Sequence, residues 1–213
     1  MTEVHIVMAA NRHLYEDVLD SYHRIRHEVF VKERGWKAVE REDGRDIDAY
    51  DRGETVHLIA IDGSRVVGGQ RLTPTTAPHM LSEIFPNLAA VKGVPTGPSI
   101  WEASRYFVVR ERRSGRTDCT MLAAVQEFGI DEGITHYSAV IETWWLPRLH
   151  EAGFVVRPLG LPTLIENQWA VAAEVEVRES SRDRARALGG ITGSVLVRRG
   201  PQVPLLRQVE HAT

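Results

Sequence analysis

The sequence predicts a mixed α/β sandwich, in which helices pack against a central sheet. The predicted elements run strand, helix, long loop, strands, helix, strand, helix, strands, and this order holds too many consecutive strands for a doubly wound sheet. A predicted helix also separates the strands at 100–109 and 135–143, so a right-handed crossover makes those two strands parallel neighbours.

Length and composition allow one large domain. The chain has 213 residues, of which 43% are hydrophobic and 26% charged, and its formal net charge of -3 carries no nucleic-acid signature. The single cysteine, Cys119, excludes an intramolecular disulfide and a cysteine-based metal cluster. The N-terminus lacks a signal pattern and no stretch reaches about 18 apolar residues. We therefore expect a soluble cytoplasmic protein with one domain over 1–213 and a less ordered tail from about residue 182.

The N-terminal half predicts a strand, a long helix and a β-hairpin. Apolar residues recur at helical spacing from Leu14 to Phe30, so we expect a helix with Asn11 as N-cap that ends near Gly35. The polar stretch 36–53 has no sustained period, and a loop of that length typically serves as a lid or a binding loop. The strands expected from apolar and β-branched runs are 4–8, 55–61 and 65–72, the last two joined by the turn Asp62-Gly63-Ser64.

The C-terminal half is organised around residues 101–109, whose β-branched and aromatic content predicts one central strand. Glu102 and Arg105 lie inside it, where an unpaired charge is costly, so they pair with each other and their neighbours or with a charged ligand. Because strand side chains alternate, they face opposite sides unless a β-bulge re-aims one and opens the sheet there, which would mark the active site. The other expected elements are helices at 80–85, 117–132 and 146–152 and strands at 135–143, 154–158 and 169–177.

Two groups of residues in the N-terminal half suit a charged ligand. Arg26 and Phe30 share a helix face, and with Trp36 they would bracket a cation and meet a carboxylate; the alternative is an ordinary helix end with a snorkelling arginine. Asp48 and Asp51 would hold an ammonium or sulfonium group, or orient an arginine; the alternative is a solvated acidic loop. The spacing of these acids does not fit a calcium loop.

Later groups are each open to two interpretations. Gly68-Gly69 before Arg71 allows close approach of a ligand or marks a bulge. His23 and His27 are four residues apart but lack a third ligand, so we expect a polar helix face and no metal site. Trp144-Trp145 is either packing or the wall of an acyl or aryl pocket. A basic turn precedes a helix N-terminus, where it is either a phosphate site or simply a charged turn, and contains Arg110, Arg112, Arg113 and Arg116.

The order of these residues is more specific than any one of them. Arg-x-x-x-Phe, then Trp, then Asp-x-x-Asp, then Arg-Leu-x-Pro-Thr and Glu-x-x-Arg resembles the N-terminal signature of the acyl-homoserine-lactone synthases, the LuxI type of autoinducer synthase. The resemblance extends over roughly residues 5–180, and no signature position is replaced. The matching positions are Arg26, Phe30, Trp36, Asp48, Asp51, Arg71, Glu102 and Arg105.

The resemblance implies a GNAT-like three-layer sandwich whose mixed central sheet is splayed into a V that holds a thioester's pantetheine arm. It implies acyl transfer to the α-amine of S-adenosylmethionine, then lactonisation with release of methylthioadenosine, without a prosthetic group. Glu102 would be the general base, directly or through one water. Backbone amides near the bulge would stabilise the thioester oxyanion. The other seven signature residues would shape the S-adenosylmethionine pocket.

Within that family, the segment 142–154 looks most like members that make branched-chain or aryl products and take acyl-coenzyme A in place of acyl carrier protein. Thr143, Trp144 and Trp145 would then shorten the acyl pocket. The basic turn would bind coenzyme A phosphates or the acidic helix of a carrier protein. Two alternatives stay open: a GNAT-type N-acyltransferase acting on another amine, and a non-enzymatic sensor that binds S-adenosylmethionine without turnover. The sequence leaves the oligomeric state open.

Overall fold

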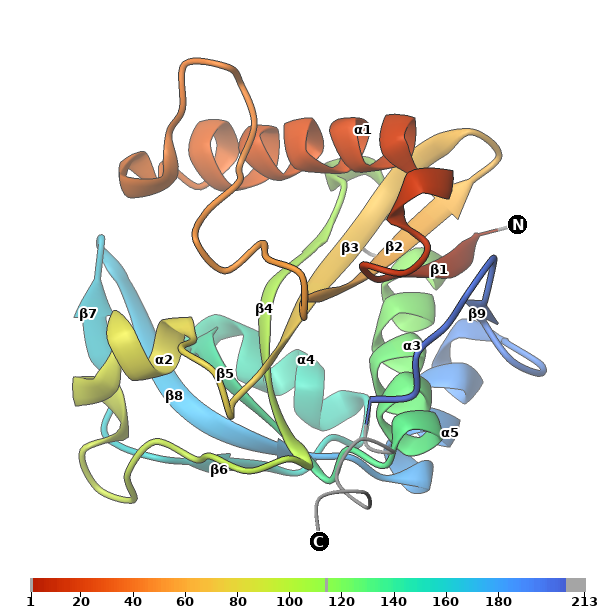
Figure 1. The fold of residues 1–213 in the computed structure, drawn as a ribbon. Helices are drawn as coiled ribbons and strands as arrows, with labels where there is room; N and C mark the ends of the chain where they lie inside the picture. The colour runs from red at the N-terminus through yellow and green to blue at the C-terminus, as the bar shows by residue number, and fades with distance from the viewer. Residues whose placement is uncertain (1, 114, 206–213) are drawn as a thin grey trace, which may run out of the picture.

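The computed structural model describes residues 2–113 and 115–205 as helices packed on both faces of one mixed sheet (Figure 1). The helices are α1 (Glu16–His27), α2 (Met80–Glu83), α3 (Arg116–Glu132), α4 (Leu146–Glu151) and α5 (Glu179–Gly189). The strands are β1 (Glu3–Val7), β2 (Val56–Asp62), β3 (Arg65–Pro74), β4 (Ile100–Val108), β5 (His136–Glu142), β6 (Val156–Pro158), β7 (Thr163–Ile165), β8 (Gln168–Glu176) and β9 (Leu196–Val197).

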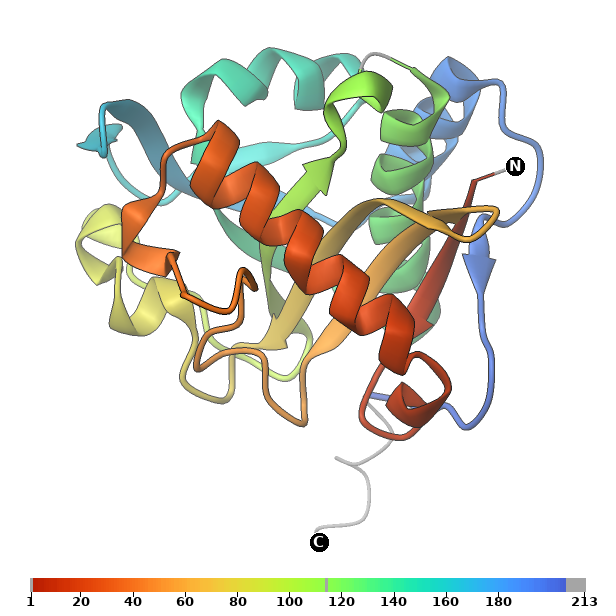
Figure 2. The ribbon, with the colours of Figure 1, turned by 90° about the horizontal axis from the view of Figure 1, so that it is seen from above.

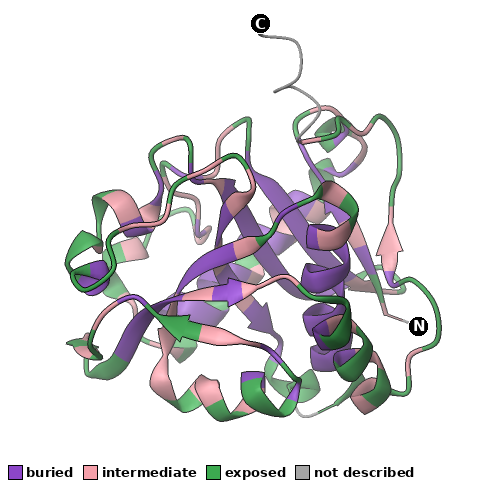
Figure 3. Cartoon of the chain, turned by 90° about the horizontal axis from the view of Figure 1, so that it is seen from below, coloured by how far each residue is buried: buried purple, intermediate pink, exposed green. Residues whose placement is uncertain are grey.

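The sheet runs in the order β6-β8-β5-β4-β3-β2-β1-β9, and β7 pairs with β8 outside this path. Helix α1 lies across β2 and β3 on one face, and α3 and α5 cover the other (Figures 1 and 2). The most buried positions lie along the central strands and α3 (Figure 3). This arrangement confirms the predicted three-layer mixed α/β fold. No helix among the described residues combines the length and apolar character needed to cross a bilayer.

The sheet divides at the junction of β4 and β5. These strands are parallel, as predicted, but they pair only from Ile100 to Glu102 and from His136 to Ser138. Beyond this point no β4–β5 pairing is formed, so the two strands part as the predicted V requires. Strand β5 continues on its other side, pairing with β8 along its whole length.

A β-bulge, which the sequence left open as an alternative, lies in β4 immediately after the point where the V opens. On β3 the pairing moves by two residues, from Gly69 to Arg71, while on β4 it moves by three, from Phe107 to Ser104. The extra β4 residue places Arg105 at a φ of 54°, a left-handed conformation that is uncommon outside glycine. Ser104 and Arg105 therefore both face the α1 side of the sheet. There the Ser104 hydroxyl accepts from Arg71 of β3, and Arg105 donates to Asp46.

Two expectations about local structure were wrong. Asn11 does not cap α1, because its amide closes the turn after β1: Oδ1 accepts from the Met8 N–H, and Nδ2 donates to the carbonyls of Ile6 and Arg199. Within the described residues 182–205, the stretch expected to be a less ordered tail instead forms the rest of α5 and then β9 paired with β1, and the part of that prediction at 206–213 lies outside the described residues. Helix α5 is polar because it buries little more than a stripe that includes Ala185, so its composition resembled a tail.

Candidate functional site

Three arginines and three aspartates form a closed ring of ion pairs between α1, the loop that follows it and the central strands. Each arginine contacts two aspartates, and each aspartate contacts two arginines. The three arginine side chains are at most 2% exposed. The members, in order around the ring, are Arg26, Asp51, Arg71, Asp48, Arg105 and Asp46.

Arg26 projects from α1 and holds the loop at two points. Its Nη1 and Nη2 lie 2.7 and 3.1 Å from the two oxygens of Asp51, and its Nε lies 3.0 Å from Asp46. Burial opposes ionisation of both aspartates, but the neighbouring guanidinium groups outweigh it and hold the pKa of Asp46 and of Asp51 below the usual value. The two carboxylates are therefore charged at neutral pH, and they anchor the 36–53 loop over the sheet.

The strands supply the other two arginines. Arg71 of β3 reaches Asp48 at 2.5 Å and Asp51 at 3.0 Å, and its Nε donates to the Ser104 hydroxyl. The bulge turns Arg105 toward the same loop, where it donates to Asp46 at 2.7 Å and to Asp48 at 3.0 Å. The side chain of Asp48 is 21% exposed, whereas those of the other five members are 3% exposed or less. Asp48 is thus the member of the ring most open to a ligand.

An aromatic pair extends the ring toward the V. Phe30 and Trp36 stack with ring centroids 4.9 Å apart, and the Arg105 guanidinium lies 5.4 and 5.7 Å from their centroids. Arg34 lies over the same two rings and also reaches Glu142 at the end of β5, with 3.4 Å between Nη1 and Oε2. The two rings therefore stack on each other and do not bracket a cation between them, and Arg34 and Arg105 are the cations beside them.

Glu102 lies near the ring but takes no part in it. One carboxylate oxygen accepts from the Leu81 N–H at 2.6 Å and the other from the Met80 N–H at 3.1 Å, so Glu102 binds the N-terminus of α2. The residue is 2% exposed. A carboxylate has about four acceptor positions, so these two bonds leave others available. The sequence predicted that Glu102 pairs with Arg105 and its neighbours or with a charged ligand, and it did not predict this contact with α2.

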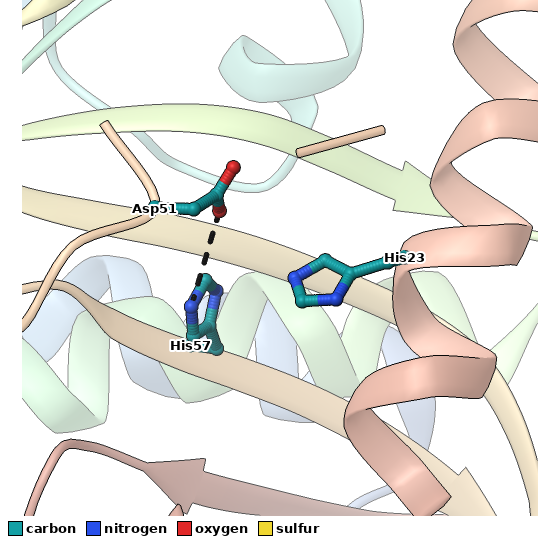
Figure 4. Close-up of side chains that lie close together, drawn as sticks. All are labelled: His23, Asp51 and His57. Atoms are coloured by element: carbon teal, nitrogen blue, oxygen red, sulfur yellow. Dashed lines mark ion pairs between the residues drawn. The ribbon is translucent and has the colours of Figure 1, made fainter. Parts of the chain in front are cut away.

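Two histidines, His23 of α1 and His57 of β2, lie beside Asp51 of the ring (Figure 4). His23 and His27 are both buried, so the expected polar helix face is wrong. The structure instead brings His23, Asp51 and His57 together, with a potential metal-ligand atom of each within 4.8 Å of the others. Burial is the main cause that lowers the pKa of His23 to about 4 and of His57 to about 3. Both oxygens of Asp51 already accept bonds from arginines, which opposes a further cation there.

The two adjacent tryptophans that follow β5 have different environments. Trp145 packs edge-on against Tyr106 of β4, with 5.0 Å between ring centroids, whereas Trp144 is 58% exposed. The Tyr106 hydroxyl donates to Asp118 of α3, which also accepts a bond from Arg148 of α4. Trp145 therefore packs against a hydrogen-bonded side chain of β4, whereas Trp144 is exposed. Thr143 begins the short helical turn that carries both indoles.

The basic turn after β4 is partly neutralised within the chain. Arg112 pairs with Asp62 at 2.9 Å, and Arg113 pairs with Glu33. Arg110 and Arg116 make no ion pair with any residue in the described part of the chain. Arg112 and Arg116 line a cavity of about 430 Å³ that also contains the carboxylate of Glu111.

The sequence interpretation missed Asp46, which is fully buried in the ring. No local pattern distinguishes Asp46 from the other acids of the 36–53 loop, which include Glu40, Glu42 and Asp43. Arg34 and Glu142 were missed as well. They form a pair 108 residues apart in sequence, which no local pattern indicates.

The comparisons with known proteins identify the family of the chain. The family description "Autoinducer synthase" matches residues 10–185. An isovaleryl-homoserine lactone synthase of Bradyrhizobium diazoefficiens is 59% identical over 180 residues, which are 84% of this chain and 82% of that protein.

Solved structures extend the likeness to three dimensions. The CoA-dependent acyl-homoserine lactone synthase BjaI, solved with S-adenosylmethionine and isopentyl-CoA, is 53% identical, covers 98% of both chains and superposes with a TM-score of 0.94. A Lactobacillus plantarum structure assigned as an N-acetyltransferase shares only the fold, at 17% identity and a TM-score of 0.56 over 83% of this chain and 99% of that one. The GNAT-like fold class predicted from the sequence is confirmed, and this chain belongs to the autoinducer synthase family.

Proposed function

We propose that this protein is an acyl-homoserine lactone synthase that uses S-adenosylmethionine and a short branched-chain or aryl acyl-CoA. The observation that carries the proposal is the buried ring of three arginines and three aspartates beside a parted pair of strands. S-adenosylmethionine carries a carboxylate, an ammonium and a sulfonium group, so its site must offer both signs of charge in fixed positions.

In the first step the α-amine attacks the thioester carbonyl and the coenzyme A thiolate leaves. An α-amine has a pKa of about 7.7 to 8.0, so it must lose a proton before it attacks. We assign Glu102 as the base, because it is buried at the junction where β4 and β5 part and retains free acceptor positions. In the second step the methionine carboxylate attacks the carbon next to the sulfonium and displaces methylthioadenosine.

The seven remaining signature residues would bind S-adenosylmethionine. Asp48 is the accessible carboxylate for a cationic group, while Phe30 and Trp36 provide the apolar wall. Ring members that are fully engaged with each other hold the pocket in shape. For the donor, Trp145 rather than Trp144 would limit the acyl chain, because Trp145 packs against Tyr106 of β4 whereas Trp144 is exposed. Arg110 and Arg116 are the members of the basic turn best placed for a donor's phosphates, since Arg112 and Arg113 already have partners.

Incubation with S-adenosylmethionine and a panel of acyl-CoA and acyl-carrier-protein donors tests the proposal, with mass detection of both products. We expect acyl-homoserine lactone and methylthioadenosine in equal amounts, with short branched or aryl acyl-CoA preferred. Lactone formed only from carrier-protein donors would refute the coenzyme A assignment. An acylated amine without methylthioadenosine would favour a general N-acyltransferase, and binding without turnover a sensor. We also propose a cytoplasmic location, on the composition and single cysteine of the chain.

The Glu102→Gln variant tests the base. We expect kcat to fall by about 100-fold or more while the affinity for S-adenosylmethionine changes little. Equal losses in kcat and affinity would indicate a binding role instead. Because Glu102 also holds α2, the thermal midpoint of the variant should be measured alongside.

A further inference from the structure

One buried carboxylate, that of Asp118 in α3, connects the two arms of the V. These arms are the parts of β4 and β5 beyond their last paired residues. Oδ1 of Asp118 accepts a hydrogen bond from the Tyr106 hydroxyl of β4 at 2.7 Å. Oδ2 accepts from Nε of Arg148 at 2.8 Å and lies 2.6 Å from Nη2 of the same side chain. Because Arg148 belongs to α4, which begins directly after the turn that ends β5, Asp118 joins the β4 arm to the continuation of the β5 arm.

The backbone does not join the arms at this level. Strands β4 and β5 pair through residues 100–102 and 136–138, and their ladder does not continue in the described part of the chain. Tyr106 lies beyond the last paired residue of β4, and Trp145 follows the end of β5. Their rings meet edge-on, with 5.0 Å between centroids. Side chains rather than backbone hydrogen bonds therefore link the two arms here.

Asp118 holds both members of this ring contact. Burial and the neighbouring Asp118 carboxylate raise the pKa of the Tyr106 hydroxyl well above its usual range, so the hydroxyl stays a donor at neutral pH. Trp145 is the N-cap residue of α4, so the bond to Arg148 fixes the helix that begins at Trp145. The side chain of Asp118 is 3% exposed, and it lies in the first turn of α3, where the helix dipole favours a negative charge.

We propose that Asp118 is a positioning residue that sets the width of the V and thereby limits the length of the acyl chain that the protein accepts. The inference rests on the proposed function, in which the acyl chain of the thioester lies between the parted strands. While Asp118 holds Tyr106 and α4, the Trp145 ring stays in place and restricts the space for a long straight chain. Loss of either bond lets the ring move aside, so a longer chain fits.

Tyr106→Phe and Asp118→Asn each break one of the two bonds with almost no change in volume. Phenylalanine removes the donor on β4, whereas asparagine keeps an oxygen for Tyr106 but turns an N–H group toward the Arg148 guanidinium. We expect the ratio of kcat/KM for octanoyl-CoA to kcat/KM for isovaleryl-CoA to rise by about 10-fold or more in both variants, since each methylene in an apolar pocket changes this ratio by about 10-fold or more. The KM for S-adenosylmethionine should stay within about threefold.

Tyr137→Phe is the matched control for a purely structural effect. Tyr137 is 2% exposed, and its hydroxyl donates to the Val125 carbonyl of α3 at 2.9 Å. It lies on β5 where that strand is still paired with β4, so its loss should not change the width of the V. We expect a lower thermal midpoint and an unchanged ratio of acyl-CoA specificities. If Asp118 served stability alone, Tyr106→Phe and Asp118→Asn would give this same result.

A double-variant cycle tests whether Asp118 acts through Trp145. Trp145→Ala removes the ring that Asp118 holds, so adding Asp118→Asn to it should not raise the octanoyl-to-isovaleryl ratio further. Independent, additive increases would contradict the proposed route.

A wild-type specificity ratio in both Tyr106→Phe and Asp118→Asn would overturn the inference. If Asp118→Asn does not fold, Tyr106→Phe alone decides, because it leaves the Asp118–Arg148 ion pair intact. The wild-type protein separates this inference from the proposed function. If it forms lactone while both variants keep its specificity ratio, only the positioning role fails. If it forms no lactone from any acyl thioester, the proposed function fails and the inference falls with it.

Discussion

Replacing Asp46 by asparagine should weaken the fold more than any surface charge change in the same loop. Asp46 is buried and accepts bonds from Arg26 at 3.0 Å and from Arg105 at 2.7 and 3.3 Å. Asparagine keeps the shape but turns one acceptor into a donor that faces guanidinium N–H groups, and it leaves two buried cations with one carboxylate fewer. Removal of one partner from a buried ion pair costs about 3 to 5 kcal/mol, against a typical total stability of about 5 to 15 kcal/mol.

Urea unfolding followed by circular dichroism measures this loss, and Asp43→Asn is the matched control. Asp43 lies three residues earlier in the same loop and pairs with Arg41, but their side chains are 37% and 51% exposed. Such exposed pairs contribute less than about 1 kcal/mol. Calorimetric titration should also show weaker S-adenosylmethionine binding for Asp46→Asn, because Arg105 loses an anchor. Equal losses in the free energy of unfolding for Asp46→Asn and Asp43→Asn would show that the ring does not stabilise the loop.

Three further predictions follow from particular contacts. A histidine in the unfolded chain has a pKa of about 6.5. In the folded protein, mainly because burial opposes the charge, the pKa of His23 is lowered to about 4 and that of His57 to about 3. The unfolded state therefore binds more protons below pH 6.5, so the stability falls as the pH is lowered. Each histidine should remove about 2 kcal/mol between pH 7.5 and pH 5 by urea unfolding, and His57→Gln should flatten the slope by about half; an unchanged slope would contradict this. Trp145→Ala should admit longer acyl chains in a donor panel whereas Trp144→Ala should not, and equal profiles would remove Trp145 from the acyl pocket. Gly69→Ala would place its Cβ within 2.4 Å of the buried Tyr22 ring and should cost about 1 to 3 kcal/mol, while Gly53→Ala, which meets nothing within 4 Å, should be neutral; equal melting temperatures would refute the packing argument.

Much of the fold follows from local patterns that the sequence displays directly. The hairpin around Asp62-Gly63-Ser64, the short helix at Met80 and the crossover helix α3 each carry their own periodicity or turn residues, and each lies where predicted. The sequence raised a bulge in this strand as an alternative to side chains on opposite faces, and the structure places it at Arg105. Strand β7 was missed because three residues are too few to show a period.

The sequence by itself determined the family, the order of the main elements from β1 to β8 apart from β7, and eight residues of the signature, because motif spacing and periodicity are properties of the chain. Only the tertiary structure decided which charges meet: Asp46 closes the ring, Glu102 binds the N-terminus of α2, and His23 lies beside His57 and not His27. It also decided that Trp145 packs against Tyr106 of β4 whereas Trp144 is exposed. The physical reason is that ion pairing, burial and hydrogen-bond satisfaction act through space between residues tens of positions apart, so adjacent residues with the same chemistry have different roles.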